Sequence, residues 1–304
     1  MRALVAGAQG LVGERLVRVL RAAGHDVVGT ARRTNEARLS PWERVPPVMR
    51  ATDLTHPSEV DALVDEARPN VIFNAAGMTD VDACERDPDG AWRGNVQVTV
   101  NLTRAAKRVG AHLVHLSTDY VFDGREGPYP EDAVPNPNGA YALSKHASEL
   151  AARTLLPGSA VVRTAVVYGW PPSRKQNFGA WMVTQLSRGE EVKLFSDQLI
   201  TPTLAESCAR MVAEIGTRGL GGIWHAAGAT AVDRVVFGQA LCAQFGFDTG
   251  LIVPTRLADV KLAGPRPPRA GLLVGRAQSE LSEKPLALDD ALRRFHAEWR
   301  EAAG

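Results

Sequence analysis

The sequence predicts an α/β protein: a doubly wound parallel sheet of the Rossmann type, with a smaller, interrupted C-terminal substrate domain. Short apolar segments alternate with amphipathic segments through the first half of the chain, as in βαβ units. A glycine-rich loop at residues 7–13 follows the first apolar segment and opens the first amphipathic one, as in dinucleotide-binding folds. The 304 residues, 45% of them hydrophobic, are enough for about two domains.

The elements of the first half follow from the spacing of apolar residues. Gly24 and Gly110 end two of the helices expected there. Ligands bind outside the carboxyl ends of the strands in such a sheet, so the residues that end each strand are candidates for the site. We expect strands at residues 3–6, 26–30, 48–51, 71–74, 113–117 and 160–167, and helices at residues 11–23, 57–67, 87–109 and 141–154.

The pattern loosens after Gly169. Residues 122–139, rich in proline and glycine, predict a long loop. We expect a dinucleotide-binding domain at residues 1–168, with residues 192–228 partly returning to it, and a substrate-binding domain at residues 169–304, with a cleft between the two. The elements expected in this half are helices at residues 178–187, 204–215, 232–245 and 288–300 and strands at residues 192–195 and 222–226.

Charge and cysteine content exclude several classes of protein. The 35 Lys and Arg balance 34 Asp and Glu, so no global field attracts nucleic acid or an anionic membrane, and no apolar stretch is long enough to span one. Cys84, Cys208 and Cys242 have neither the even count of a disulfide framework nor zinc spacing, and a cytoplasmic location is the default. We expect no metal site, since His112 and His115 project from opposite faces of a strand.

The glycine loop is the expected site of a dinucleotide. Gly7, Gly10 and Gly13 follow a strand and open a helix, so that backbone amides can receive a pyrophosphate. The spacing differs from Gly-x-Gly-x-x-Gly, and a glycine turn between strand and helix is the plain alternative. Three further loop residues are expected to contact the cofactor: Gln9, Leu11 and Val12.

Two arginines stand where a ribose-binding carboxylate is expected. Arg32 and Arg33 follow the second strand, and guanidinium groups suit the 2′-phosphate of NADPH, although NADH is an alternative and the arginines could be solvated loop residues. Asp53, beside Leu54, is placed to hydrogen-bond an adenine amine or, as readily, to cap a helix.

Small residues end the strand at residues 71–74. Asn74, Ala75, Ala76 and Gly77 would let a ligand lie against the backbone, whereas a tight turn alone would not require the two alanines. Asn95, on the long helix expected next, either organises proton transfer beside the cofactor or satisfies a backbone carbonyl.

A hydroxyl, a phenol and an ammonium follow the glycine loop in an order that suggests carbonyl reduction. Thr118 ends a strand, and Tyr141 and Lys145 lie four residues apart, on one face of a helix. The ammonium would favour the phenolate and moderate the pKa of Tyr141, with hydride supplied by the cofactor. Tyr-x-x-x-Lys alone is common in helices; the three elements in this order are not.

Together these motifs resemble the extended short-chain dehydrogenase/reductase superfamily and, within it, the dTDP-4-dehydrorhamnose reductase family. The most specific mark is Ser-Thr-Asp-Tyr-Val-Phe-Asp-Gly at residues 117–124, where Tyr120 replaces the base Glu of sugar-nucleotide dehydratases. The resemblance implies that Thr118 hydrogen-bonds the substrate carbonyl, Tyr141 donates the proton, and Lys145 holds the nicotinamide ribose. The residues that it implies at the sugar nucleotide are Asp119, Tyr120, Asn177, Gln198 and Thr201.

The resemblance implies NADPH-dependent reduction of the 4-keto group of a dTDP-4-dehydro-6-deoxy sugar, most closely dTDP-4-dehydrorhamnose to dTDP-L-rhamnose, by an enzyme compatible with a homodimer. Asp233 and Arg234 stand where the family usually has Trp, and Leu273 and Arg276 where it has Asp and Lys, so another sugar is an alternative. Two other readings are a related reductase or epimerase, and a non-catalytic regulatory subunit like the methionine adenosyltransferase beta subunit.

Overall fold

The structure is a computed structural model that describes residues 1–32, 48–171 and 176–303. Its centre is a seven-stranded sheet in the order β11-β6-β5-β4-β1-β2-β3, and every neighbouring pair is parallel. The predicted α/β class is thereby confirmed. The strands are β1 (Arg2–Ala6), β2 (Asp26–Ala31), β3 (Val48–Ala51), β4 (Val71–Asn74), β5 (His112–Thr118), β6 (Ala160–Thr164) and β11 (Gly222–His225).

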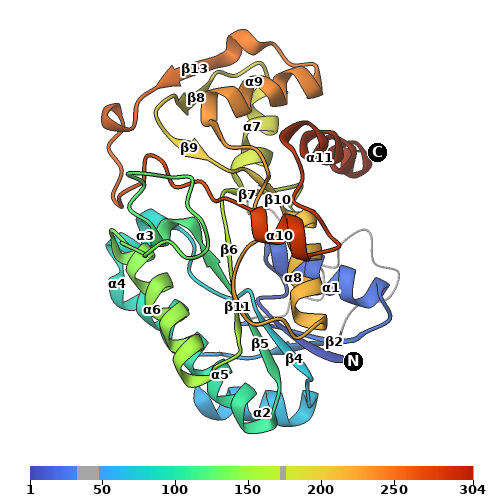
Figure 1. The fold of residues 1–304 in the computed structure, drawn as a ribbon. Coiled ribbons are helices and arrows are strands. Elements are labelled where there is room, and N and C mark those ends of the chain that lie inside the picture. Colours follow the sequence, from blue (N-terminus) through green and yellow to red (C-terminus); the bar gives the residue numbers. More distant parts are fainter. Residues whose placement is uncertain (33–47, 172–175, 304) are drawn as a thin grey trace.

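Helices cover both faces of the sheet (Figure 1). Side chains alternate along each strand, so Ala3 and Val5 of β1 pack in one core while Leu4 and Ala6 pack in the other. Both faces are therefore apolar, as in other parallel sheets. One face carries α1 (Leu11–Ala22) and α8 (Ala205–Thr217), and the other carries α2 (Pro57–Ala67), α5 (Val98–Val109) and α6 (Ala140–Leu155).

The long helix predicted at residues 87–109 is confirmed as continuous helix over residues 88–109, which includes a π-helical stretch, and a separate short helix precedes it. Asp80 accepts from the Ala83 amide at 2.9 Å, and Asp87 from the Gly90 amide at 2.8 Å. Each cap starts a new helix, and Pro88 follows the second cap at a position where its missing N–H costs nothing. The short helix is α3 (Val81–Arg86), and the long one consists of α4 (Pro88–Ala91), the π-helix η1 (Trp92–Gln97) and α5.

The strand predicted at residues 160–167 ends early, at Thr164. Val166 has φ +40°, a left-handed conformation unusual for a β-branched residue, so the chain leaves the sheet there. It resumes as β7 (Val167–Tyr168), which pairs with β10 (Thr203–Leu204). The β7 strand thus leads from the sheet into the C-terminal part of the molecule.

The C-terminal part has its own core, in which the Tyr168 ring meets the rings of Phe237 and Phe295 edge to face. The expected strand at residues 192–195 belongs here, outside the central sheet. The elements are α7 (Phe178–Leu186), β8 (Val192–Phe195), β9 (Leu199–Ile200), β12 (Val232–Asp233), α9 (Arg234–Phe245), η3 (Thr249–Leu251), β13 (Ile252–Thr255), η4 (Leu257–Asp259), α10 (Gly275–Glu280) and α11 (Leu288–Ala303). Across the described ranges, no helix combines the length and apolarity that a bilayer span requires.

Candidate active site

The glycine loop lies between β1 and α1, and its backbone is packed too tightly for side chains. Gly7 has φ +76°, and a Cβ there would lie 2.7 Å from the Ala75 carbonyl oxygen. A Cβ at Gly13 would lie 2.2 Å from the Gly7 oxygen. Gly10 precedes α1 without any side-chain cap, so the first amides of this helix are left for an anion. These features fit the pyrophosphate of a dinucleotide.

Arg32 and Asp53 lie near one another beyond β2 and β3. Asp53 accepts hydrogen bonds from the amide and hydroxyl of Thr55, at 3.0 and 2.7 Å, and these bonds with the nearby Arg32 charge lower its pKa. His56, not Asp53, precedes α2, so the helix-cap alternative is wrong. Leu54 is buried in the core, and its carbonyl accepts from Asn101 at 2.9 Å. Arg33 lies outside the described residues.

Asn95 connects the loop after β4 to the helix that carries Tyr141. Its Oδ1 accepts from the Met78 amide at 2.8 Å, and its Nδ2 donates to the Met78 carbonyl at 3.1 Å and the Ser144 hydroxyl at 2.9 Å. A Cβ at Gly77 would lie 2.8 Å from Asn95 Oδ1. The side chain therefore satisfies a backbone carbonyl, as one of the two sequence alternatives stated, and also positions α6.

A second buried network begins at Asn74, the last residue of β4. Its Nδ2 lies 3.1 Å from the Thr99 hydroxyl and 3.1 Å from Nδ1 of His115, and His115 Nε2 lies 2.9 Å from the Ser148 hydroxyl. Burial keeps the pKa of His115 well below its usual value, so this imidazole is neutral. The network joins β4, β5, α5 and α6. Sequence reasoning missed Ser144 and Ser148. Their positions on α6, one turn after Tyr141 and Lys145, could have indicated them.

The three catalytic candidates come together at the carboxyl end of β5. Thr118 is its last residue, and Tyr141 and Lys145 lie one turn apart on α6; all three side chains are buried. Lys145 Nζ donates to the Leu116 carbonyl at 2.7 Å, which leaves its other N–H groups available to a ligand. The packing of α6 on β5 thus brings Thr118 and Tyr141 together, although they lie far apart in the sequence.

Burial dominates the titration of these groups. It raises the pKa of Tyr141 above its ordinary value, with the Asp119 charge adding to the rise and a hydrogen bond with Thr118 opposing it. Burial lowers the pKa of Lys145 to about 8, while Glu149 acts in the opposite direction. Tyr141 is therefore a neutral phenol at neutral pH, the form that can donate a proton. The pKa of Tyr141 is thus shifted in the direction opposite to the lowering expected from Lys145.

Asp119 and Tyr120 directly follow Thr118, in the short helix η2 (Asp119–Val121). Asp119 Oδ1 accepts from the Thr118 hydroxyl at 3.1 Å, and Oδ2 is buried without a partner among the described residues. Burial raises the pKa of Asp119 to about 7, although the Thr118 hydrogen bond and the Arg234 charge oppose the rise. The Tyr120 ring meets the Tyr141 ring edge-on, with centroids 5.7 Å apart.

The other expected substrate residues make contacts within the protein. Asn177 accepts from the Ala180 amide at 3.2 Å, capping α7, and donates to the Gly169 carbonyl at 2.8 Å. Thr201 is buried and accepts from the Leu272 amide at 3.2 Å. Gln198 is buried as well, with Nε2 donating to the Pro267 carbonyl at 3.2 Å and Oε1 accepting from Arg234. In the structure these side chains therefore hold neighbouring segments together.

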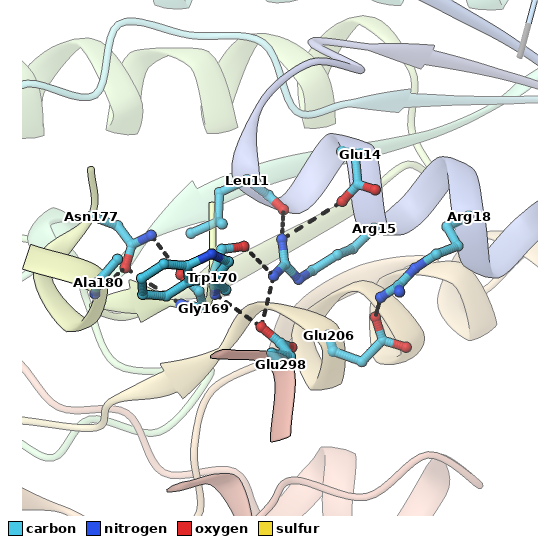
Figure 2. Close-up of polar contacts among 10 residues, drawn as sticks. All are labelled: Leu11, Glu14, Arg15, Arg18, Gly169, Trp170, Asn177, Ala180, Glu206 and Glu298. Carbon is cyan, nitrogen blue, oxygen red and sulfur yellow. Dashed lines mark hydrogen bonds and ion pairs between the residues drawn. The ribbon is translucent and has the colours of Figure 1, made fainter. Parts of the chain in front are cut away.

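Arg15 ties the helix behind the glycine loop to the C-terminal helix, a connection that sequence reasoning missed. Its Nη2 donates to the Trp170 carbonyl at 2.8 Å and to Glu298 Oε2 at 2.9 Å, and the Trp170 amide donates to the same oxygen at 2.9 Å (Figure 2). Its Nη1 donates to the Leu11 carbonyl at 3.1 Å. The Arg15–Glu298 contact therefore holds α1, α11 and the end of β7 together.

The fold and this site define a class of protein. A parallel sheet with a glycine loop after β1, and Thr, Tyr and Lys side chains gathered at the end of β5, make an extended short-chain dehydrogenase/reductase. The chain belongs to the family described as "RmlD substrate binding domain", whose model matches residues 1–301. It is a dinucleotide-dependent oxidoreductase of the dTDP-4-dehydrorhamnose reductase type.

Curated relatives and solved structures agree with this assignment. A Haloferax volcanii protein named a probable low-salt glycan biosynthesis reductase is 34% identical, over 98% of both chains. The dTDP-4-dehydrorhamnose reductase of Mycobacterium tuberculosis is 31% identical, over 87% of this chain and 82% of that protein. The Bacillus anthracis dTDP-4-dehydrorhamnose reductase, solved in complex with NADP, superimposes with a TM-score of 0.85 at 26% identity, over 98% of this chain and 99% of the other.

Proposed function

We propose that the chain reduces the 4-keto group of a dTDP-4-dehydro-6-deoxy sugar with NADPH, and that its substrate is dTDP-4-dehydrorhamnose, the product being dTDP-L-rhamnose. The observation that carries the proposal is the convergence of Thr118, Tyr141 and Lys145 at the end of β5. A regulatory binding module has no need for all three groups. Related proteins named as reductases of dTDP-linked keto sugars support the substrate class.

The residues present fit a dinucleotide. The uncapped amides of α1 suit the pyrophosphate, and Arg32 suits a 2′-phosphate. The unused N–H groups of Lys145 suit the hydroxyls of the nicotinamide ribose. Bound NADPH supplies the hydride for the reduction. In the proposal Asn95 acts on the cofactor pocket indirectly, by holding the loop after β4 against α6.

The chain's own residues carry the proton transfer. Thr118 donates a hydrogen bond to the C4 carbonyl oxygen and so stabilises the negative charge that develops there. Tyr141 gives its phenolic proton to this oxygen while the carbonyl carbon receives the hydride, and the product is the alcohol. Lys145, one turn away on α6, stabilises the resulting phenolate until solvent returns the proton. The raised pKa of Tyr141 keeps the proton in place before the reaction.

The proposed location is the cytoplasm, where both soluble substrates would be available. The three cysteines, Cys84, Cys208 and Cys242, are buried and unpaired, which is consistent with a reducing compartment.

The test is an assay of the purified chain with NADPH and dTDP-4-dehydrorhamnose (dTDP-4-dehydro-6-deoxy-L-mannose). The reaction is monitored by the loss of NADPH absorbance, and the 4-hydroxyl product is then identified. We expect turnover that disappears in Tyr141→Phe. Reduction of a different 4-keto sugar nucleotide would change the substrate and keep the chemistry. No NADPH oxidation with any keto sugar nucleotide would overturn the proposal.

A further inference from the structure

Arg234 is the first residue of α9, and its guanidinium group is contacted along one edge and over one face. The antiparallel pairing of β12 with β9 sets Asp233 opposite Leu199, which brings Arg234 next to Gln198. Its Nε donates to Gln198 Oε1 at 2.5 Å, and its Cζ lies 4.4 Å from the centre of the Phe178 ring. Gln198 is itself only 2% exposed and is anchored to the Pro267 carbonyl. The guanidinium is therefore preorganised, and the Tyr120 phenol is a further hydrogen-bond partner.

Arg234 forms no ion pair with a carboxylate within the parts of the chain that the structure describes; the buried Asp119 acts on its charge without pairing with it. The neighbouring Arg266 differs, because it pairs with Asp82 at 3.0 Å. A half-buried cation without a counter-ion is costly, and an anion brought by a ligand would remove that cost. The planar guanidinium fork suits the oxygens of a phosphate group.

Arg234 also borders the space in which the proton donor lies. Its charge acts on Tyr120 and on the buried Asp119, and the Tyr120 ring touches the Tyr141 ring. In a nucleoside diphosphate sugar the diphosphate is attached at C1, at the opposite end of the pyranose ring from C4. A phosphate held at Arg234 would thus direct C4 towards the catalytic end of the pocket.

We infer that Arg234 binds the β-phosphate of the sugar nucleotide and thereby places the C4 carbonyl at Thr118 and Tyr141. The inference rests on the proposed function, since it takes a nucleoside diphosphate sugar as the substrate. Gln198 and Phe178 act as positioning residues, which orient the guanidinium without touching the substrate.

The test compares the binding of dTDP and dTMP by calorimetry in the full-length chain and in Arg234→Met. Two charge-assisted hydrogen bonds lost from the β-phosphate should weaken dTDP binding about 10- to 100-fold and leave dTMP binding unchanged. The dTDP affinity of Arg234→Lys should lie between those of the parent and Arg234→Met, because lysine keeps the charge and lacks the planar guanidinium fork. Arg293→Met, which removes an exposed arginine of α11, is the matched control and should bind both nucleotides normally.

NADPH binding in each variant checks that the fold is intact, and Arg234→Gln replaces the Met variant if that one fails to fold. Unchanged dTDP affinity, or equal losses for dTDP and dTMP, would overturn the role of Arg234. Failure of the proposed function has a different signature: the unaltered chain would bind NADPH but none of dTDP, UDP, GDP and CDP. If the chain binds a nucleoside diphosphate other than dTDP, the test compares the affinity for that diphosphate with the affinity for the corresponding monophosphate.

Discussion

Arg163 and Glu149 form an ion pair joined by two hydrogen bonds, and their side chains are 1% and 2% exposed. Nε of the arginine donates to Oε1 at 2.9 Å and Nη2 to Oε2 at 2.8 Å. Burial alone would raise the pKa of Glu149, but the nearby His146 ring and the hydrogen bonds and charge of Arg163 lower it to about 2. Glu149 lies one turn after Lys145, so the pair fixes α6 against β6.

Breaking this ion pair should destabilise the protein strongly. Arg163→Met leaves a buried carboxylate unpaired, and we expect a loss of about 3–5 kcal/mol in the free energy of unfolding, measured with urea. The contribution of the ion pair to the free energy of unfolding is fully present above the ordinary carboxyl pKa and disappears as the pH falls towards about 2. Arg163→Met combined with Glu149→Leu should recover much of the loss. A single variant as stable as the parent would contradict this account.

Tyr141→Phe should abolish proton donation while keeping the ring that packs against Tyr120. We expect turnover to fall about 10²- to 10⁴-fold, the usual contribution of a general acid, with NADPH affinity retained. Stopped-flow fluorescence gives the affinity and steady-state kinetics the turnover. Near-parental turnover would remove Tyr141 from the mechanism.

Arg32→Ala should reduce the preference for NADPH over NADH. A guanidinium bound to the 2′-phosphate contributes about 1.5–3 kcal/mol, and NADH lacks the group that it would bind. We therefore expect kcat/KM to fall for NADPH and to change little for NADH, and a larger effect when Arg33 is also replaced. Equal use of both cofactors by the unaltered chain would contradict the prediction.

Asp119→Asn should change how stability depends on pH. Burial raises the folded-state pKa of Asp119 to about 7, so the folded protein binds this proton more tightly than the unfolded chain does. The stability due to protonation is present below the ordinary carboxyl pKa and is lost as the pH rises through about 7. The variant should therefore gain up to about 2–3 kcal/mol relative to the parent between about pH 5 and about pH 8. Parallel stability curves would show that the carboxyl is not perturbed.

Arg15→Met should loosen the connection between the two parts of the molecule. It leaves the Trp170 carbonyl without its Arg15 donor and leaves Glu298, which is 21% exposed, with only the Trp170 amide, so we expect a loss of about 1–3 kcal/mol by chemical denaturation. Arg18→Met is the control on the same helix, because Arg18 is 35% exposed in its pair with Glu206 and should matter less. An equal effect of the two substitutions would show that the Arg15 contact has no special role.

Local patterns in the sequence were sufficient for much of the fold and the centre of the candidate site. Alternating apolar segments predicted the order of strands and helices in the first half. The glycine spacing predicted the tight turn at Gly7 and Gly13, where a Cβ would collide with backbone. Tyr141 and Lys145 share a helix face because they lie four residues apart, and this relationship needs no distant partner.

Tertiary structure decided the contacts between residues that lie far apart in the chain. Gln198 reaches Arg234, Asn95 reaches Ser144, and Arg15 reaches Glu298 only because β12 pairs with β9, α6 packs beside η1, and α11 returns to α1. A smaller case is the short helix α3, which the apolar pattern did not predict and which begins at the Asp80 cap and ends before the Asp87 cap. A local pattern reports which face of an element is apolar. The partner of a buried polar side chain is set by the packing of whole elements, and the sequence by itself does not contain that geometry in any local form.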